Sequence, residues 1–397
     1  MENQEISRLK SEMEDELRGN ILPFWVQHAV DSEYGGFYGK ISNDLKADSS
    51  AEKGGVLNAR ILWTYARAYM QYGEVQYKDM ADRAYRYIID NFIDKEQGGV
   101  YWLLDNTGMP ADTKKQIYAQ AFTIYGFVEY YEAFKNTNAL DEAIKLFHLI
   151  ETHAYDPVNK GYFEAANRGW EIGQYTLDDK CGAEQKSMNT MLHILEAYTS
   201  LYRVWKNEDL YNKLIEIIEI FLTKIINGDT NRFKLFFDDK WNSLNADCSF
   251  GHDIEGSWLL DEAAQVAGDT ALIEKVRAIA VNMAEAAIEG IDSDNGLAYE
   301  GNEKGITDSD RNWWPQAEAV VGFFNAFEIS GNKKYLDTAI NSWDFIRRFI
   351  IDWQYGEWYW GKRRDGSVIR PDAKVDMWKC CYHNSRACFE IMKRAGL

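Results

Sequence analysis

The chain has 397 residues, of which 63 are acidic and 44 basic, and its net charge of −19 argues against nucleic acid and anionic lipid as partners. No apolar run approaches the roughly 18 residues of a membrane span, and the N-terminal residues lack the basic and apolar regions of a signal peptide. Five cysteines without metal-type spacing indicate free thiols in a reducing compartment, so we expect a cytoplasmic protein, a monomer or weak homo-oligomer, with a neutral small molecule as its partner.

A turn motif recurs along the chain at intervals of roughly sixty residues, which is the mark of a repeat architecture. The motif is Asp-x-x-x-Gly followed by aromatic residues. It is one residue longer at 156–161, and 234–237 is a degenerate copy without the glycine. The regular copies are 31–35, 94–98, 292–296 and 352–356.

Between these turns the apolar residues recur at three- and four-residue steps, which predicts amphipathic outer helices. The outer helices are expected at 6–18, 77–92, 140–152, 210–226, 272–288 and 335–350. Alternate segments carry Ala, Gly and aromatic residues on nearly all sides and predict buried inner helices, for example 61–72, 118–134, 319–329 and 378–393. We expect left-handed residues to end helices at Gly73, Asn136, Asn207, Gly268 and Gly331.

The pattern predicts an all-α fold, an (α/α)6 barrel of six inner and six outer helices joined at one end by short hairpins or loops. An open solenoid would need polar capping repeats, whereas the last inner segment is as apolar as the middle ones. No linker or low-complexity run interrupts the period, so we expect a single catalytic domain over residues 1–397.

Three of the six histidines fall near the starts of predicted inner helices, namely His193, His252 and His383. The other three lie in or just beyond outer helices, where surface or capping roles are expected. Other polar and aromatic residues fall at the same position in the repeat as the first three histidines, near the starts of the inner helices. They are Asn58, Arg60, Tyr118, Asn189, Glu255, Trp314, Glu318 and Trp378.

Each of these residues alone could be a satisfied core group. Their coincidence on five helices instead predicts one pocket, because pairs at i,i+3 or i,i+4 share a helix face and the barrel brings the helix starts to one mouth. Fourteen tryptophans would suit stacking on sugar faces, although most aromatic residues are expected to fill helix interfaces.

The candidate pocket suits proton transfer better than cofactor chemistry. The sequence has neither a Gly-x-Gly-x-x-Gly fingerprint nor a P-loop, so no cofactor is expected. His252 and Glu255 could supply metal ligands, but His-Glu-x-x-His is absent and Glu255 could simply orient the imidazole, so we expect no metal. A histidine pair could remove a proton beside a carbonyl and return it, while an arginine stabilises the enediolate oxygen.

Five motifs in this order resemble the N-acylglucosamine 2-epimerase superfamily over essentially the full length, and its cellobiose 2-epimerase branch most of all. They are Asn58-Ala-Arg60, Lys186-Ser-Met-Asn189-Thr-Met-Leu-His193, Gly251-His252-Asp-Ile-Glu255-Gly-Ser-Trp258, Trp313-Trp314-Pro-Gln-Ala-Glu318 and Trp378-Lys-Cys-Cys-Tyr-His383-Asn. The resemblance implies an (α/α)6 barrel and a cofactor-independent epimerisation at C2 of the reducing-end glucose of β-1,4 disaccharides.

The resemblance also implies a role for each residue. His252 and His383 correspond to the acid/base pair, and His193 to a third histidine that supports ring opening or the intermediate. Arg60 corresponds to the residue near O1 and O2, and Glu255 to the one that orients the histidine pair. The substrate-binding positions are Tyr118, Asn189, Trp258, Trp314, Glu318 and Trp378. Cys381 departs from the proline expected there.

Three alternatives stay open at this point. An N-acylglucosamine 2-epimerase or mannose isomerase would share the histidine pair but act on a monosaccharide. A glycoside hydrolase would need two carboxylates, for which Glu255 and Glu318 are the candidates, and would leave three histidines unexplained. A non-catalytic carbohydrate-binding barrel would use the tryptophans alone.

Overall fold

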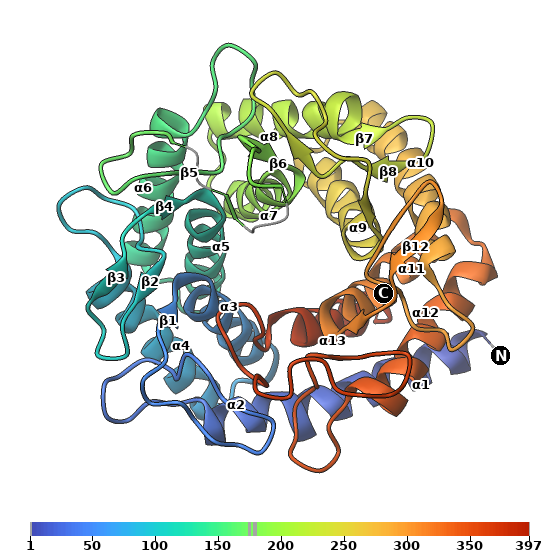
Figure 1. The fold of residues 1–397 in the computed structure, drawn as a ribbon, viewed down its shortest axis with the longest axis horizontal. Coiled ribbons are helices and arrows are strands. Elements are labelled where there is room, and N and C mark those ends of the chain that lie inside the picture. The colour runs from blue at the N-terminus through green and yellow to red at the C-terminus, as the bar shows by residue number, and fades with distance from the viewer. Residues whose placement is uncertain (1, 174–175, 178–180, 397) are drawn as a thin grey trace.

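Two concentric rings of helices surround one axis (Figure 1). The computed structural model describes residues 2–173, 176–177 and 181–396. The inner ring consists of α3 (Gly55–Tyr72), α5 (Ile117–Phe134), α7 (Met188–Val204), α9 (Phe250–Ala267), α11 (Trp313–Ser330) and α13 (Tyr382–Arg394). Within the described part of the chain, the predicted (α/α)6 barrel with six inner and six outer helices is confirmed.

Most outer helices continue into a short π-helical or 3-10 segment, labelled η. The outer ring consists of α1 (Glu2–Glu16) with η1 (Leu17–Ile21) and α2 (Leu22–His28), α4 (Val75–Tyr87) with η2 (Ile88–Phe92), α6 (Thr137–His153), α8 (Glu208–Ile220) with η3 (Phe221–Ile225), α10 (Thr270–Ala287) with η4 (Ile288–Gly290), and α12 (Lys333–Phe345) with η5 (Ile346–Ile350). No helix among the described residues is long and apolar enough to cross a membrane.

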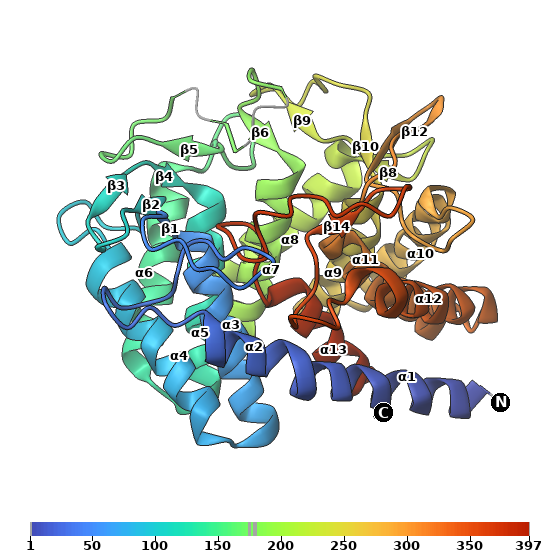
Figure 2. The same cartoon turned by 60° about the horizontal axis from the view of Figure 1, so that its bottom comes forward.

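Short strands gather at one end of the barrel (Figure 2). They are β1 (Lys53–Gly54), β2 (Leu103–Leu104), β3 (Pro110–Asp112), β4 (Lys115–Gln116), β5 (Ala165–Ala166), β6 (Lys186–Ser187), β7 (Ile226–Asn227), β8 (Arg232–Phe233), β9 (Phe236–Phe237), β10 (Cys248–Ser249), β11 (Glu300–Asn302), β12 (Gly305–Asp308), β13 (Arg311–Asn312) and β14 (Gly361–Lys362).

The strand pairing repeats around the ring. The strand before each inner helix pairs antiparallel with the segment that follows the next outer helix, as in β1 with β2, β4 with β5, β6 with β9, β10 with β11 and β13 with β14. The ring closes with the same pairing, because Ile41 after α2 bridges Val375 ahead of α13. This pairing holds all inner-helix starts at one mouth.

Among the described residues, an ion pair anchors each turn of the repeat except one, and it is buried in all of these but the Asp292 pair. The Asp31 carboxylate accepts the backbone N–H groups of Glu33 and Tyr34 and binds Lys53 Nζ at 2.6 Å, and this lysine lies in β1 just before α3. Equivalent pairs are Asp94 with Lys115, Asp156 with Lys186, Asp292 with Arg311, and Asp352 with Lys374. The motif therefore repeats because its aspartate binds the start of the next inner helix.

Three predicted markers need correction. The fourth turn begins at Asn227, not in 234–237: Ile226 pairs with Phe233, and the ion-pair aspartate is replaced by asparagine. Gly73, Gly268 and Gly331 do end inner helices with positive φ. Asn136 and Asn207 instead begin outer helices, because their side chains accept the backbone N–H of Ala139 and Leu210.

The last inner helix starts at Tyr382, four residues later than predicted from 378–393. The Asp376 carboxylate accepts the backbone N–H groups of Trp378 and Lys379, both at 2.8 Å, and this turn delays the helix. Cys380 and Cys381 therefore lie before the helix, not inside it.

Candidate active site

The mouth of the barrel opens into a cavity of about 680 Å³, within the range of roughly 300–1,000 Å³ that is typical of small-molecule sites. Its wall comes from residues at or before the starts of the inner helices and from the hairpins above them. Nine of the eleven predicted site residues line it, namely Arg60, Tyr118, Asn189, His193, His252, Glu255, Trp314, Trp378 and His383.

His383, on the first turn of α13, is held by a buried carboxylate. Its Nδ1 lies 2.7 Å from Glu318 Oε1 and 4.0 Å from Glu255 Oε1. Burial raises the pKa of Glu318, and Arg386 and the Trp258 N–H oppose that effect. In its ionised form this carboxylate accepts the Nδ1 proton and so leaves the lone pair of the neutral ring on Nε2. Burial lowers the pKa of His383 well below its usual value, and the positive charges of Arg60 and Arg386 lower it further. His383 is therefore set up as a base.

His193 repeats this arrangement on α7. Its Nδ1 lies 2.9 Å from Glu196 Oε2, and its ring meets the edge of Tyr118 with 4.8 Å between centroids. Burial lowers the pKa of His193, and Glu196 offsets part of that effect. Burial opposes ionisation of Glu196, but Arg386 and His193 outweigh it and lower the pKa of this carboxyl to about 2.

His252, on the first turn of α9, is oriented by a hydroxyl. Its Nδ1 lies 2.8 Å from Oγ of Ser249, the N-cap residue, which also accepts the backbone N–H of His252. The Ser249 hydroxyl and His252 Nδ1 share one hydrogen bond, in which either group can be the donor. Ser249 thus contacts His252, and Glu255 lies near His383, the other member of the pair; the orienting role of Glu255 stays a prediction.

Arg60 and Tyr118 form the polar wall opposite the carboxylates. One Arg60 terminal nitrogen donates to Tyr118 Oη at 2.8 Å and the other to the Trp378 carbonyl at 3.2 Å. The guanidinium also lies over the Phe122 ring, 4.2 Å from its centroid. Arginine stays protonated under all ordinary conditions, so a permanent positive charge faces the cavity.

The surroundings of Glu255 favour its neutral, protonated form. Burial raises its pKa to about 8, and the nearby Glu318 carboxylate adds to the effect. Around neutral pH the group therefore carries a proton that it can donate as a hydrogen bond. Aromatic rings complete the wall: Trp314 packs on His252 with centroids 4.6 Å apart, and Trp378 packs on Trp102 at 5.6 Å.

Glu255, Glu318 and His383 bring one ligand atom each within 4.8 Å of one another, which is a geometry that could hold a metal ion. A guanidinium already binds both carboxylates, because the Arg386 terminal nitrogen lies 2.5 Å from Glu255 Oε1 and 2.6 Å from Glu318 Oε1. A metal ion there would face a fixed buried cation. The donor set is therefore unsuited to a metal, and the expectation of a metal-free site stays a prediction.

A family model described as N-acylglucosamine 2-epimerase (GlcNAc 2-epimerase) matches residues 36–387. The chain is 49% identical to the cellobiose 2-epimerase of Bacteroides fragilis, over 97% of this chain and 98% of that protein. It is 39% identical to the cellobiose 2-epimerase of Dictyoglomus turgidum, again over 97% and 98%. The solved structure of the cellobiose 2-epimerase from Bacillus thermoamylovorans B4167 matches with a TM-score of 0.93 at 38% identity, covering 98% of this chain and 100% of that one.

The chain belongs to the N-acylglucosamine 2-epimerase family. This confirms the family resemblance that the sequence motifs indicated. The protein is an epimerase, which is a type of isomerase.

Two of the predicted substrate-binding residues lie behind the cavity wall of this protein. Trp258 and Glu318 are at most 1% exposed and are absent from the lining. Trp258 Nε1 donates to Glu318 Oε2 at 3.1 Å, and Glu318 holds His383. Both side chains therefore lie behind His383, and the substrate contacts that the resemblance implies for them stay a prediction.

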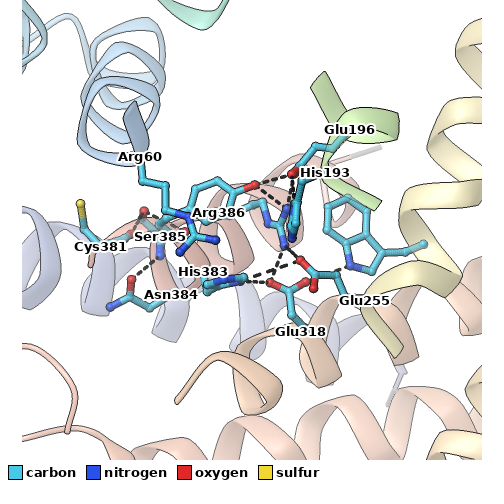
Figure 3. Close-up of polar contacts among 12 residues, drawn as sticks. Arg60, His193, Glu196, Glu255, Glu318, Cys381, His383, Asn384, Ser385 and Arg386 are labelled. Carbon is cyan, nitrogen blue, oxygen red and sulfur yellow. Dashed lines mark hydrogen bonds and ion pairs between the residues drawn. The ribbon is translucent and has the colours of Figure 1, made fainter. Parts of the chain in front are cut away.

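Sequence reasoning missed two residues at the centre of the site, Arg386 and Glu196 (Figure 3). A signal for both was available, because Glu196 follows His193 by three residues and Arg386 follows His383 by three. The same spacing drew attention to Glu255. Ser249 could have been found as the N-cap residue three positions before His252.

Proposed function

We propose that the protein epimerises C2 of the reducing-end glucose of β-1,4 disaccharides such as cellobiose and lactose, converting it to mannose without a cofactor. The observation that carries this proposal is that His383 and His252 both line one cavity and both pack against Trp314, with centroid separations of 5.7 and 4.6 Å. Two imidazoles around one binding space suit removal of a proton from carbon and its return.

The reaction would run on the open-chain sugar. One imidazole takes the C2 proton, and the C–H electron pair becomes the C1–C2 double bond of a cis-enediolate. The Arg60 guanidinium stabilises the oxygen that becomes negative, and the protonated Glu255 donates a hydrogen bond on the opposite side. The second imidazole then delivers a proton to the other face of C2. The histidines exchange roles in the reverse direction, and His193 supports ring opening.

The form of the cavity supports a two-ring substrate. Trp314 and Trp378 belong to its wall, and Trp360 and Tyr299 extend the aromatic surface. Aromatic faces of this kind stack on the apolar faces of sugar rings. Asn189 lies in the same wall and supplies a polar contact for sugar hydroxyls. The relatives named above as cellobiose 2-epimerases support the same substrate class.

Hydrolysis fits the carboxylates poorly. Glycosidases place two carboxyl groups about 5 Å apart or more, on either side of the scissile bond. Here Glu255 and Glu318 both bind the same Arg386 guanidinium, so they lie on one side of the site and not on two sides of a bond. Glu318 is fully buried, so no glycosidic bond can pass between the two groups.

The test is to incubate the protein with cellobiose and identify the products by NMR, with mannose and N-acetylglucosamine in parallel and EDTA in a duplicate set. We expect 4-O-β-glucosyl-mannose from cellobiose, with the same yield in EDTA. Free glucose would identify a hydrolase. Conversion of the monosaccharides alone would identify a monosaccharide epimerase or isomerase, and either result would contradict the proposal.

A further inference from the structure

Arg386 lies at the centre of the buried polar groups beneath the cavity floor (Figure 3). One terminal nitrogen binds Glu196 Oε1 and lies 2.6 Å from Tyr382 Oη. The other lies 2.5 Å from Glu255 Oε1 and 2.6 Å from Glu318 Oε1. One guanidinium therefore joins carboxylates that come from three inner helices, α7, α9 and α11.

The two outermost carboxylates of this network each hold a histidine. Glu196 binds His193 Nδ1 at 2.9 Å, and Glu318 binds His383 Nδ1 at 2.7 Å. A continuous chain of hydrogen bonds therefore runs from one imidazole through Arg386 to the other. All its members are at most 5% exposed, so water does not screen their charges.

The positive charge of Arg386 matters because acidic groups outnumber basic groups around it. Without a central cation, the carboxylates of Glu196 and Glu318 could not both stay ionised beside the Glu255 carboxyl group, and further protons would be needed to neutralise them. The titratable and charged groups that face His383 are Glu318 on α11, Glu255 on α9, His193 and Glu196 on α7, Arg60 on α3, and Arg386 on its own helix. His252 lies across the Trp314 ring from it.

We propose that Arg386 is a positioning residue that couples the two histidine–glutamate pairs, holding both imidazoles in place and keeping His383 unprotonated as a base. It does so without touching the substrate, since it is absent from the cavity lining. The inference rests on the proposed function for its catalytic consequence, but its electrostatic part concerns the protein alone.

The electrostatic part is tested by NMR titration of 15N-labelled histidine in the full-length protein. Six histidines give a small spectrum, and the His383 signals are assigned by their loss in His383→Gln. In Arg386→Gln the positive charge is lost and a planar hydrogen-bonding group remains. Removing a cation favours the charged imidazolium, so we expect the titration midpoint of His383 to rise by about one pH unit or more.

Arg386→Lys separates charge from geometry. The ammonium keeps the charge, so the midpoint should stay within about half a unit of the wild type, but a single ammonium cannot bridge three carboxylates in the same geometry. We therefore expect kcat, on whichever sugar the wild type converts, to fall about tenfold or more with little change in KM.

The matched control is Arg394→Gln, which removes another arginine of α13. Arg394 binds Glu328 at 2.6 Å, Asn325 at 2.8 Å and Glu390 at 3.2 Å, none of which belongs to the Arg386 network, and its guanidinium lies 5.9 Å from the Trp258 ring centroid. Its loss should leave the His383 midpoint unchanged. Circular dichroism checks folding of every variant.

An unshifted midpoint in folded Arg386→Gln would overturn the proposal. Loss of one partner from a buried ion pair can prevent folding. If Arg386→Gln does not fold, Arg386→Lys becomes the test, and a wild-type kcat in Arg386→Lys would overturn the proposal. A wild type that does not convert cellobiose contradicts the proposed function alone, because the midpoints of His383 are measured without substrate.

Discussion

At the residue scale, two of the three cavity histidines are paired through Nδ1 with a buried glutamate, and the third with a serine hydroxyl. A carboxylate partner keeps the ring proton on Nδ1 and makes Nε2 an acceptor. A hydroxyl partner allows the opposite tautomer. His383 is therefore set up to take a proton through Nε2, whereas the hydroxyl beside His252 is compatible with either tautomer of that ring.

Replacing His383 or His252 by glutamine should lower kcat by about 10²–10⁴-fold, the usual contribution of a general acid or base. Glutamine keeps polarity and approximate size, so the melting temperature should change little. His148→Gln is the matched control, because His148 is exposed on α6 and packs on Trp205 away from the cavity. Substantial activity in either cavity variant would contradict the assigned roles; steady-state kinetics on cellobiose decides.

The pH profile of kcat/KM should be bell-shaped. His383 must be neutral to accept a proton, and burial lowers its pKa, so the acidic limb should lie below pH 6.5. Burial and Glu318 raise the pKa of Glu255 to about 8, so above that pH a new negative charge would oppose the enediolate and activity should fall. In Glu255→Gln the basic limb should disappear. A basic limb that persists there at pH 8 would assign it to another group.

The sequence identified the residues of this site better than their contacts. The cavity histidines, Arg60 and the tryptophan walls follow from placing the motifs on inner-helix starts. The network through Arg386 does not, because its members approach from helices far apart in the chain and their distances depend on the closed ring. Trp258 shows the limit: its position in a motif says nothing of whether its indole faces the cavity or the Glu318 carboxylate behind it.

At the element scale, inner helices pack closely enough that glycine is required at their crossings. A Cβ added at Gly322 of α11 would lie 2.5 Å from the Ile254 carbonyl oxygen of α9, which no side-chain movement can relieve. This contact sets the spacing between the helices that carry Glu318 and Glu255.

Gly322→Ala should therefore cost about 1–3 kcal/mol of unfolding free energy through overpacking. It should also lower kcat, since the shift displaces both carboxylates. Gly228→Ala is the control, because its added Cβ meets no atom within 4 Å in the exposed turn between β7 and β8. Urea unfolding measures the difference, and equal stability of the two variants would contradict the packing argument.

Helix periods were predictable because each helix buries a regular stripe or a whole surface, which is a local property of the sequence. The starts and ends depended on side chains whose partners are not adjacent. Asn136 and Asn207 cap the helix that follows, and Asp376 delays the last inner helix. Whether such a residue caps the next helix or ends the previous one depends on individual side-chain hydrogen bonds, which the hydrophobic periodicity does not reveal.

At the scale of the whole molecule, the repeat builds a closed ring and the site depends on that closure. The Ile41–Val375 bridge and the packing of α13 between α11 and α3 bring His383 opposite His193. The described part of the chain forms one barrel. That residues 1–397 fold as one cooperative domain stays a prediction, supported by the contacts between α1 and α13 at its two ends.

The measurement that tests the account most directly is solvent exchange at C2 during turnover. The protein is incubated with cellobiose in D2O, and the mannose-ended product is analysed by NMR before equilibrium. Histidines that exchange protons with water should deliver deuterium, so we predict product labelled at C2 of its reducing-end sugar and at no other carbon. Epimerised product that keeps its original C2 hydrogen would contradict proton transfer through two solvent-exchanging imidazoles.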